Sequence, residues 1–112
     1  MGQQHADVLD SVFAALAHPT RRAILGVLAS EEPSVSELAG RFQITLTTVA
    51  KHLRVLDRAG LVEQRKHGRV RTCRLRAAPL GDADAWISDY RAFWTGQLDA
   101  LAAHVGGRAR DV

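Results

Sequence analysis

Residues 34–59 read SVSELAGRFQITLTTVAKHLRVLDRA, and this stretch decides the fold. Its first four residues form a capping box, because the hydroxyl of Ser34 can accept the N–H of Glu37 and the glutamate can reach back. After a short helix, Thr45 is suited to cap a second one, and Gly60 is suited to the left-handed position where that helix ends. Two short helices joined by a tight turn predict a helix-turn-helix unit.

The second of these helices, expected over residues 46–59, has two faces of opposite character. At 100° per residue, four apolar side chains share one arc and are expected to be buried, namely Leu46, Val49, Leu53 and Leu56. The opposite arc is free of acidic residues and holds Thr47, Thr48, Lys51, Arg54, Val55 and Arg58. A helix of about 21 Å, at about 1.5 Å per residue, suits the major groove of B-DNA. We therefore expect this arc to contact base edges, although a solubilising surface helix has the same composition.

Residues 61–75 predict a β-hairpin, with strands over 61–66 and 69–75 and a turn at His67-Gly68. Cations crowd its tip, and like charges on paired strands repel unless an anion neutralises them. Charges that protect exposed strand edges are the alternative, but they need not share one sign. With the helix-turn-helix, this hairpin forms a winged-helix DNA-binding module. The residues predicted to contact DNA are Thr45, Thr47, Thr48, Lys51, His52, Arg54, Arg58, Arg65, Lys66, Arg69 and Arg71.

Charge is strongly segregated along the 112 residues, which suit one domain. Residues 41–76 have a formal charge of +8, whereas residues 1–40 carry −3 and residues 77–112 carry −2. A basic middle between acidic flanks favours a polyanionic partner. The chain has neither a run of about 18 apolar residues nor a secretory signal pattern, so we expect a cytoplasmic protein that does not enter a membrane.

Helices expected at the two ends, over residues 7–17 and 82–105, carry apolar faces that one small domain cannot easily cover. Four of the six aromatic residues lie between positions 86 and 94. Burial by a second copy is the economical solution, and it predicts a homodimer that binds an inverted-repeat operator. The residues predicted at the dimer interface are Val12, Phe13, Leu16, Trp86, Tyr90, Trp94, Leu98 and Leu101. Residues 106–112 are expected to form a flexible tail.

The sequence resembles the ArsR-type (arsenic-repressor-like) family of bacterial regulators. The matching stretches are FAALAHPTRRAIL at 13–25, VSELA at 35–39, TVAKHLRVLDRAGLV at 48–62 and the wing at 68–75. This resemblance implies a winged helix-turn-helix of five helices and a small hairpin, and a homodimeric repressor. It also implies a fourth helix in the major groove and a wing on the flanking backbone. Two positions depart from the family pattern: His18 replaces a frequent acidic residue, and Ala50 replaces a frequent serine.

The usual metal-ligand motifs of that family are missing, since the third helix has no cysteine and the last helix has only one histidine, His104. We therefore expect neither a metal nor another cofactor, with a composite site between subunits, for example His5 with His104, as the alternative. Cys73 is expected to be a buried, inert thiol, with redox sensing as the alternative. No catalytic motif is present, so an enzyme is not expected. A regulator that responds to a thiol or a small ligand, or a winged helix that binds only protein, are the remaining alternatives.

Overall fold

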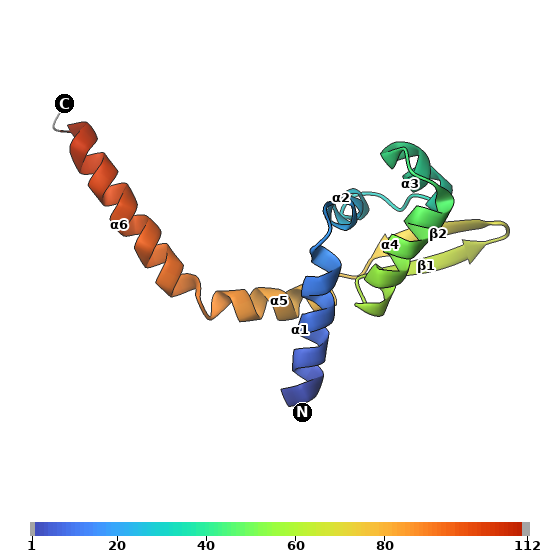
Figure 1. Cartoon of the computed structure of the whole chain (residues 1–112), viewed down its shortest axis with the longest axis horizontal. Coiled ribbons are helices and arrows are strands. Elements are labelled where there is room, and N and C mark those ends of the chain that lie inside the picture. The colour runs from blue at the N-terminus through green and yellow to red at the C-terminus, as the bar shows by residue number, and fades with distance from the viewer. Residues whose placement is uncertain (1, 111–112) are drawn as a thin grey trace.

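The computed structural model describes the backbone of residues 2–110 and the side chains of residues 7–105. Its elements confirm the predicted winged helix-turn-helix, except that two helices replace the single C-terminal one (Figure 1). In chain order they are α1 (Gly2–Leu16), α2 (Pro19–Leu28), α3 (Val35–Phe42), α4 (Leu46–Arg58), β1 (Val62–His67), β2 (Val70–Leu75), α5 (Ala78–Ser88) and α6 (Arg91–Arg110).

Local hydrogen bonds fix where the helices of the helix-turn-helix begin and end. The Ser34 hydroxyl accepts the Glu37 N–H at 3.0 Å, and the Thr45 hydroxyl accepts the Thr48 N–H at 3.1 Å. Between them, Gln43 closes α3 in the left-handed region at φ 56°, and Gly60 follows α4 at φ 74°. These contacts set α3 and α4 at a fixed angle, because the turn between them leaves few backbone conformations.

The hydrophobic core lies where α2, α3, α4 and the base of the hairpin meet. Its fully buried side chains, below 2% exposed, include Ile24, Leu38, Leu53, Leu56 and Leu61. Leu46 is the exception to the predicted buried face of α4, because it is 55% exposed. Leu46 lies in the first turn of α4, and this turn extends beyond the core. The helical periodicity alone therefore predicted burial incorrectly at this position.

The hairpin is anchored at its base and free at its tip. Its antiparallel register pairs Val62 with Leu75 and His67 with Val70, so the turn is Gly68-Arg69, one residue later than predicted. Gly68 has φ 64°, which accounts for the glycine there. The Cys73 N–H donates to the Pro33 carbonyl at 2.8 Å, which ties β2 to the segment before α3. The wing is thereby held beside the helix-turn-helix.

The C-terminal region differs from the single helix predicted over residues 82–105. Helix α5 begins at Ala78, with Pro79 in its first turn, so it starts four residues before the predicted position 82. At Asp89 and Tyr90 the N–H groups bond to carbonyls three residues back, a tightening that ends α5 before α6 starts. The apolar stripe continues across this break, which is why the sequence pattern did not reveal it. The backbone remains helical to Arg110, where a flexible tail had been expected, and the side chains of that tail lie outside the described residues.

Helix α6 projects away from the rest of the molecule, on the side opposite the wing (Figure 1). The radius of gyration is 19.0 Å, whereas about 13 Å is typical of a compact domain of this length. The molecule therefore consists of a compact winged-helix body with an extended helical arm.

Candidate nucleic-acid interface

Helix α4 presents a polar and cationic face to solvent. Thr47, Lys51, Arg54 and Arg58, which the sequence placed on this face, are all exposed. Thr48 is half-buried, and its hydroxyl lies 3.0 Å from that of Thr45, so these two threonines partly satisfy each other. Thr47 and Lys51 lie one turn apart on this exposed face.

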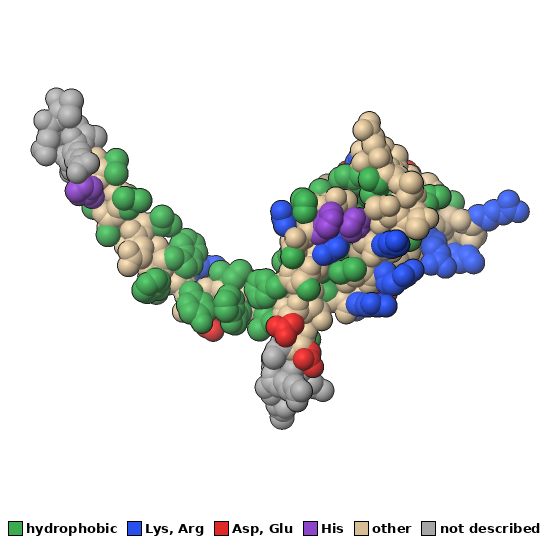
Figure 2. All heavy atoms as spheres, viewed as in Figure 1, with side chains coloured by type: hydrophobic (Ala, Val, Ile, Leu, Met, Phe, Trp, Pro, Cys, Tyr) green, Lys and Arg blue, Asp and Glu red, His purple; other side chains and the backbone are tan. Residues whose placement is uncertain are grey.

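The wing carries the second group of cations. Arg65, Lys66, Arg69 and Arg71 are exposed, and Lys66 lies directly across the ladder from Arg71. Arg65 has a partner in Glu63, at 3.7 Å, but both side chains are exposed to solvent. Figure 2 shows the Lys and Arg side chains spread along the wing and across the adjoining surface of the body. Cations from the two elements thus form one surface, as binding to a polyanion requires.

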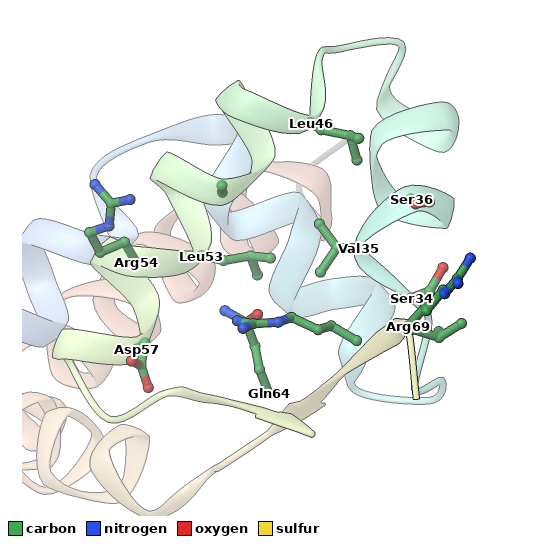
Figure 3. A pocket seen from close by; sticks show the side chains of 12 residues that line it. Ser34, Val35, Ser36, Leu46, Leu53, Arg54, Asp57, Gln64 and Arg69 are labelled. Atoms are coloured by element: carbon green, nitrogen blue, oxygen red, sulfur yellow. The ribbon is translucent and has the colours of Figure 1, made fainter. Parts of the chain in front are cut away.

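A cleft of about 610 Å³ separates the N-terminus of α3 and one side of α4 from the wing. Leu46 and Val35 line it from the helices, and Gln64 and Arg69 line it from the wing (Figure 3). The remaining lining residues are Ser34, Ser36, Ala50, Leu53, Arg54, Asp57, Val70 and Arg71.

His52 lies away from this cleft, on the side of α4 that faces α2. Its ring packs against that of His18, with centroids 4.5 Å apart, and its Nδ1 atom lies 3.5 Å from Nη1 of Arg21. Burial, with smaller contributions from the charges of His18 and Arg21, lowers the pKa of His52. Of the side chains predicted to contact DNA, His52 is therefore the one that belongs to a separate cluster.

Most of the side chains predicted at a dimer interface lie on α1, α5 and α6 and are exposed. The ring of Phe13 packs edge to face on that of Trp86, with centroids 5.6 Å apart, and the ring centroids of Trp86 and Tyr90 are 5.0 Å apart. Apolar side chains continue along the arm (Figure 2). Val12 differs from the others, because it is fully buried within the chain and has no surface to offer a partner. Leu16 is half-buried against the core.

Comparison with known proteins places this geometry in a family. A family model described as a helix-turn-helix domain matches residues 16–65. The HTH-type transcriptional regulator Rv2034 of Mycobacterium tuberculosis is 37% identical over 102 residues, which cover 91% of this chain and 92% of that protein. The solved ArsR-like transcriptional regulator from Rhodococcus sp. RHA1 is 34% identical with a TM-score of 0.73, over 96% of this chain and 97% of that one. The chain belongs to the ArsR family of transcriptional regulators.

A third similar protein bears on assembly within the ArsR family. The solution structure of Mb0332 from Mycobacterium bovis is 29% identical with a TM-score of 0.63, over 79% of this chain and 83% of that one. It is described as a homodimeric winged helix-turn-helix DNA-binding domain and a possible ArsR-family regulator.

The histidines, carboxylates and cysteine of this chain are spread over the fold. Among the side chains of residues 7–105, no three His, Cys, Asp or Glu gather as a metal site would require. The side chain of His5 lies outside the described residues, so action without a metal stays a prediction. Cys73 is fully buried, and burial raises its pKa to about 11. No helix in the described part of the chain is long and apolar enough to cross a membrane.

Sequence reasoning missed three residues that shape this ArsR-family surface. Leu46 was assigned to the core but lines the cleft, whereas His18 was noted only as a departure from the family pattern and Arg21 was given no role. The departure at His18 was a usable signal, since a histidine had replaced an acidic residue. Contact with His52, 34 positions along the chain, needed the tertiary structure.

Proposed function

We propose that this chain is a homodimeric, sequence-specific DNA-binding repressor that acts in the cytoplasm on an inverted-repeat operator. The observation that carries the proposal is the set of exposed cations on the outer face of α4 and on the neighbouring wing (Figure 2). Repression then follows from occupancy, because a dimer bound across a promoter blocks access to it. Membership of a family of transcriptional regulators, rather than of enzymes, agrees with this role.

In this proposal α4 lies in the major groove and the wing lies on the neighbouring backbone. Lys51 donates to guanine O6 or N7, while the Thr47 hydroxyl and the exposed Leu46 side chain contact a base edge and a thymine methyl group. Arg65, Lys66 and Arg69 neutralise phosphates, which removes the repulsion between them and releases counterions. Base contacts then set the preferred sequence, and phosphate contacts set most of the affinity.

Dimerisation is proposed through the apolar face of the arm. Trp94, Leu98, Leu101 and Val105 are spaced at four, three and four residues, the alternation that lines one seam of a helix packed against another. They are 43–59% exposed, which is unusual for such large apolar side chains in a monomer. The homodimeric state of Mb0332 supports pairing in this fold. Twofold symmetry would place two copies of α4 about one turn of DNA apart.

The test begins with selection of bound fragments from the source genome, followed by affinity measurement on a selected duplex and on an unrelated one. Lys51→Ala is expected to weaken binding to the selected duplex by about 5- to 150-fold, for a loss of about 1–3 kcal/mol. Binding to the unrelated duplex should weaken much less. Arg91→Ala is the matched control, because it removes one exposed cation from the arm, where Arg91 lies 3.5 Å from Asp84.

Three results would contradict the proposal. If the wild-type protein retained no fragment at low salt, DNA binding itself would be excluded, and a protein-binding winged helix would take its place. If Lys51→Ala kept full discrimination between the two duplexes, α4 would not be the helix that reads the sequence. A loss caused equally by Arg91→Ala would indicate a general charge effect and not a specific contact.

A further inference from the structure

We propose that His18, Arg21 and His52 form a second contact with the DNA backbone, a phosphate site that takes up a proton when the operator binds. This inference rests on the proposed function, since it concerns how the same regulator holds DNA. It assigns a role to a cluster that neither the base-reading face of α4 nor the wing uses.

The three side chains are held together from different elements. His18 is the N-cap of α2, Arg21 belongs to α2 itself and His52 belongs to α4. Arg21 is fixed by two backbone contacts, since Nε donates to the Ala15 carbonyl at 2.7 Å and Nη2 donates to the Ala14 carbonyl at 2.9 Å. Its remaining terminal nitrogen faces His52 at 3.5 Å. The guanidinium therefore cannot turn away from the two imidazole rings.

Hydrogen bonding assigns the ring protons. Nδ1 of His18 accepts the Thr20 N–H at 3.1 Å, so the neutral ring carries its proton on Nε2. Nδ1 of His52 faces a guanidinium donor, which gives that ring the same tautomer. Each ring thus keeps an Nε2–H donor that the cluster does not use. All three side chains are half-buried, so each retains some contact with solvent.

The charges around the cluster are positive. Among the side chains of residues 7–105, no carboxylate forms an ion pair with Arg21 or with either histidine. The charged groups that act on His52 are His18 and Arg21, and both oppose its protonation. Within α4, the residues one turn away from His52 are uncharged, namely Thr48, Val49, Val55 and Leu56. From α1, only the carbonyl oxygens that hold Arg21 reach the cluster.

The location of the cluster indicates which phosphate it would meet. A major groove is bordered by two sugar–phosphate strands, so a helix lying in it has a strand on each side. The cleft and the wing lie on one side of α4, whereas His52 faces the other. Figure 2 shows a histidine patch next to Lys and Arg side chains on the body of the molecule. The wing and this cluster would therefore hold opposite strands.

A phosphate at this position reverses the electrostatics and favours the protonated form of His52. The added proton goes to Nδ1, so the 3.5 Å contact between Nδ1 and Nη1 of Arg21 is given up and that guanidinium nitrogen donates to the phosphate instead. Burial and neighbouring cations keep the pKa of His52 low in the free protein, so a proton is taken up as the phosphate arrives. Binding that takes up one proton per subunit, and so two per dimer, strengthens by up to about a hundredfold for each unit by which the pH falls. Operator affinity should therefore rise on acidification. The rise should span the pH range between the pKa of His52 in the complex and its lower pKa in the free protein.

The experiment measures the affinity for a selected operator duplex between pH 5.5 and 8 at constant ionic strength. The wild-type protein and the control His104→Gln, which removes an exposed histidine on α6, should show the full pH dependence. His52→Gln should lose most of it. Replacing one phosphate at a time by a neutral methylphosphonate should identify a position that weakens the wild-type protein several-fold and His52→Gln hardly at all.

The outcomes separate this inference from the proposed function. If His52→Gln binds the operator with the same pH dependence as the wild type, the phosphate site is wrong, although DNA binding stands. If the wild type binds no duplex, the proposed function itself has failed. A measurement on the unaltered protein guards against misfolding of the variant: the NMR titration of the His52 ring should move to higher pH when the operator binds. A titration that stays in place or moves lower would overturn the inference.

Discussion

Replacing Trp94 by alanine should dissociate the proposed dimer, and the size of the effect follows from the structure. Taking about 200 Å² for a tryptophan side chain, the 43% that is exposed on α6 amounts to about 85 Å². Burial of this area against a partner contributes about 2 kcal/mol at about 25 cal/mol per Å². A twofold interface contains the residue twice, so the variant should lose about 4 kcal/mol, or roughly a thousandfold in the dissociation constant.

Sedimentation equilibrium over a wide concentration range measures this constant directly. Leu46→Ala is the matched control, because Leu46 is also a large exposed apolar side chain, at 55%, but lies beside the cleft on α4. The control should dimerise as the wild type does. If Trp94→Ala kept the wild-type dissociation constant, or if Leu46→Ala weakened the dimer equally, the arm would not be the dimer interface.

Three further predictions concern the winged-helix body. Leu38→Ala, at a fully buried position, should lower the free energy of unfolding by about 2–5 kcal/mol in a denaturant titration, and a loss below 1 kcal/mol would contradict the assigned core. Gly60→Ala should cost about 1–2 kcal/mol in the same assay, because φ is 74° and the new Cβ would lie 3.3 Å from Cγ of Pro79. The thiol of Cys73 should react with a disulfide reagent only as fast as the protein opens, since burial raises its pKa to about 11. The thiol of the unfolded chain ionises first, near the ordinary thiol pKa of 9.0. The free energy of unfolding should therefore be unaffected by Cys73 below pH 9 and should decline between pH 9 and pH 11.

The helix-turn-helix was predictable because its signals are local. Each cap lies within three residues of the N–H that it accepts, as at Ser34 and Thr45, and the left-handed glycine at position 60 marks the end of α4. The hairpin followed from a glycine turn between two extended segments. Such features depend on short-range sterics and hydrogen bonds, which sequence alone can specify.

What could not be predicted depends on long-range packing. The period of α4 placed Leu46 with the buried residues, but burial also depends on where the core ends, and the first turn lies beyond it. The break at Asp89 and Tyr90 left no trace in a continuous apolar stripe. The cluster around His52 joins residues 31 and 34 positions apart, so only the packing of α2 on α4 reveals it.

The central claim is that α4 and the wing together form the surface that binds DNA. Mapping backbone amide NMR shifts of the protein on titration with a selected operator duplex tests it most directly. The account predicts the largest shifts along the exposed face of α4 and through the wing, with smaller ones at the start of α2. Shifts concentrated on α5 and α6, with α4 and the wing unchanged, would contradict it.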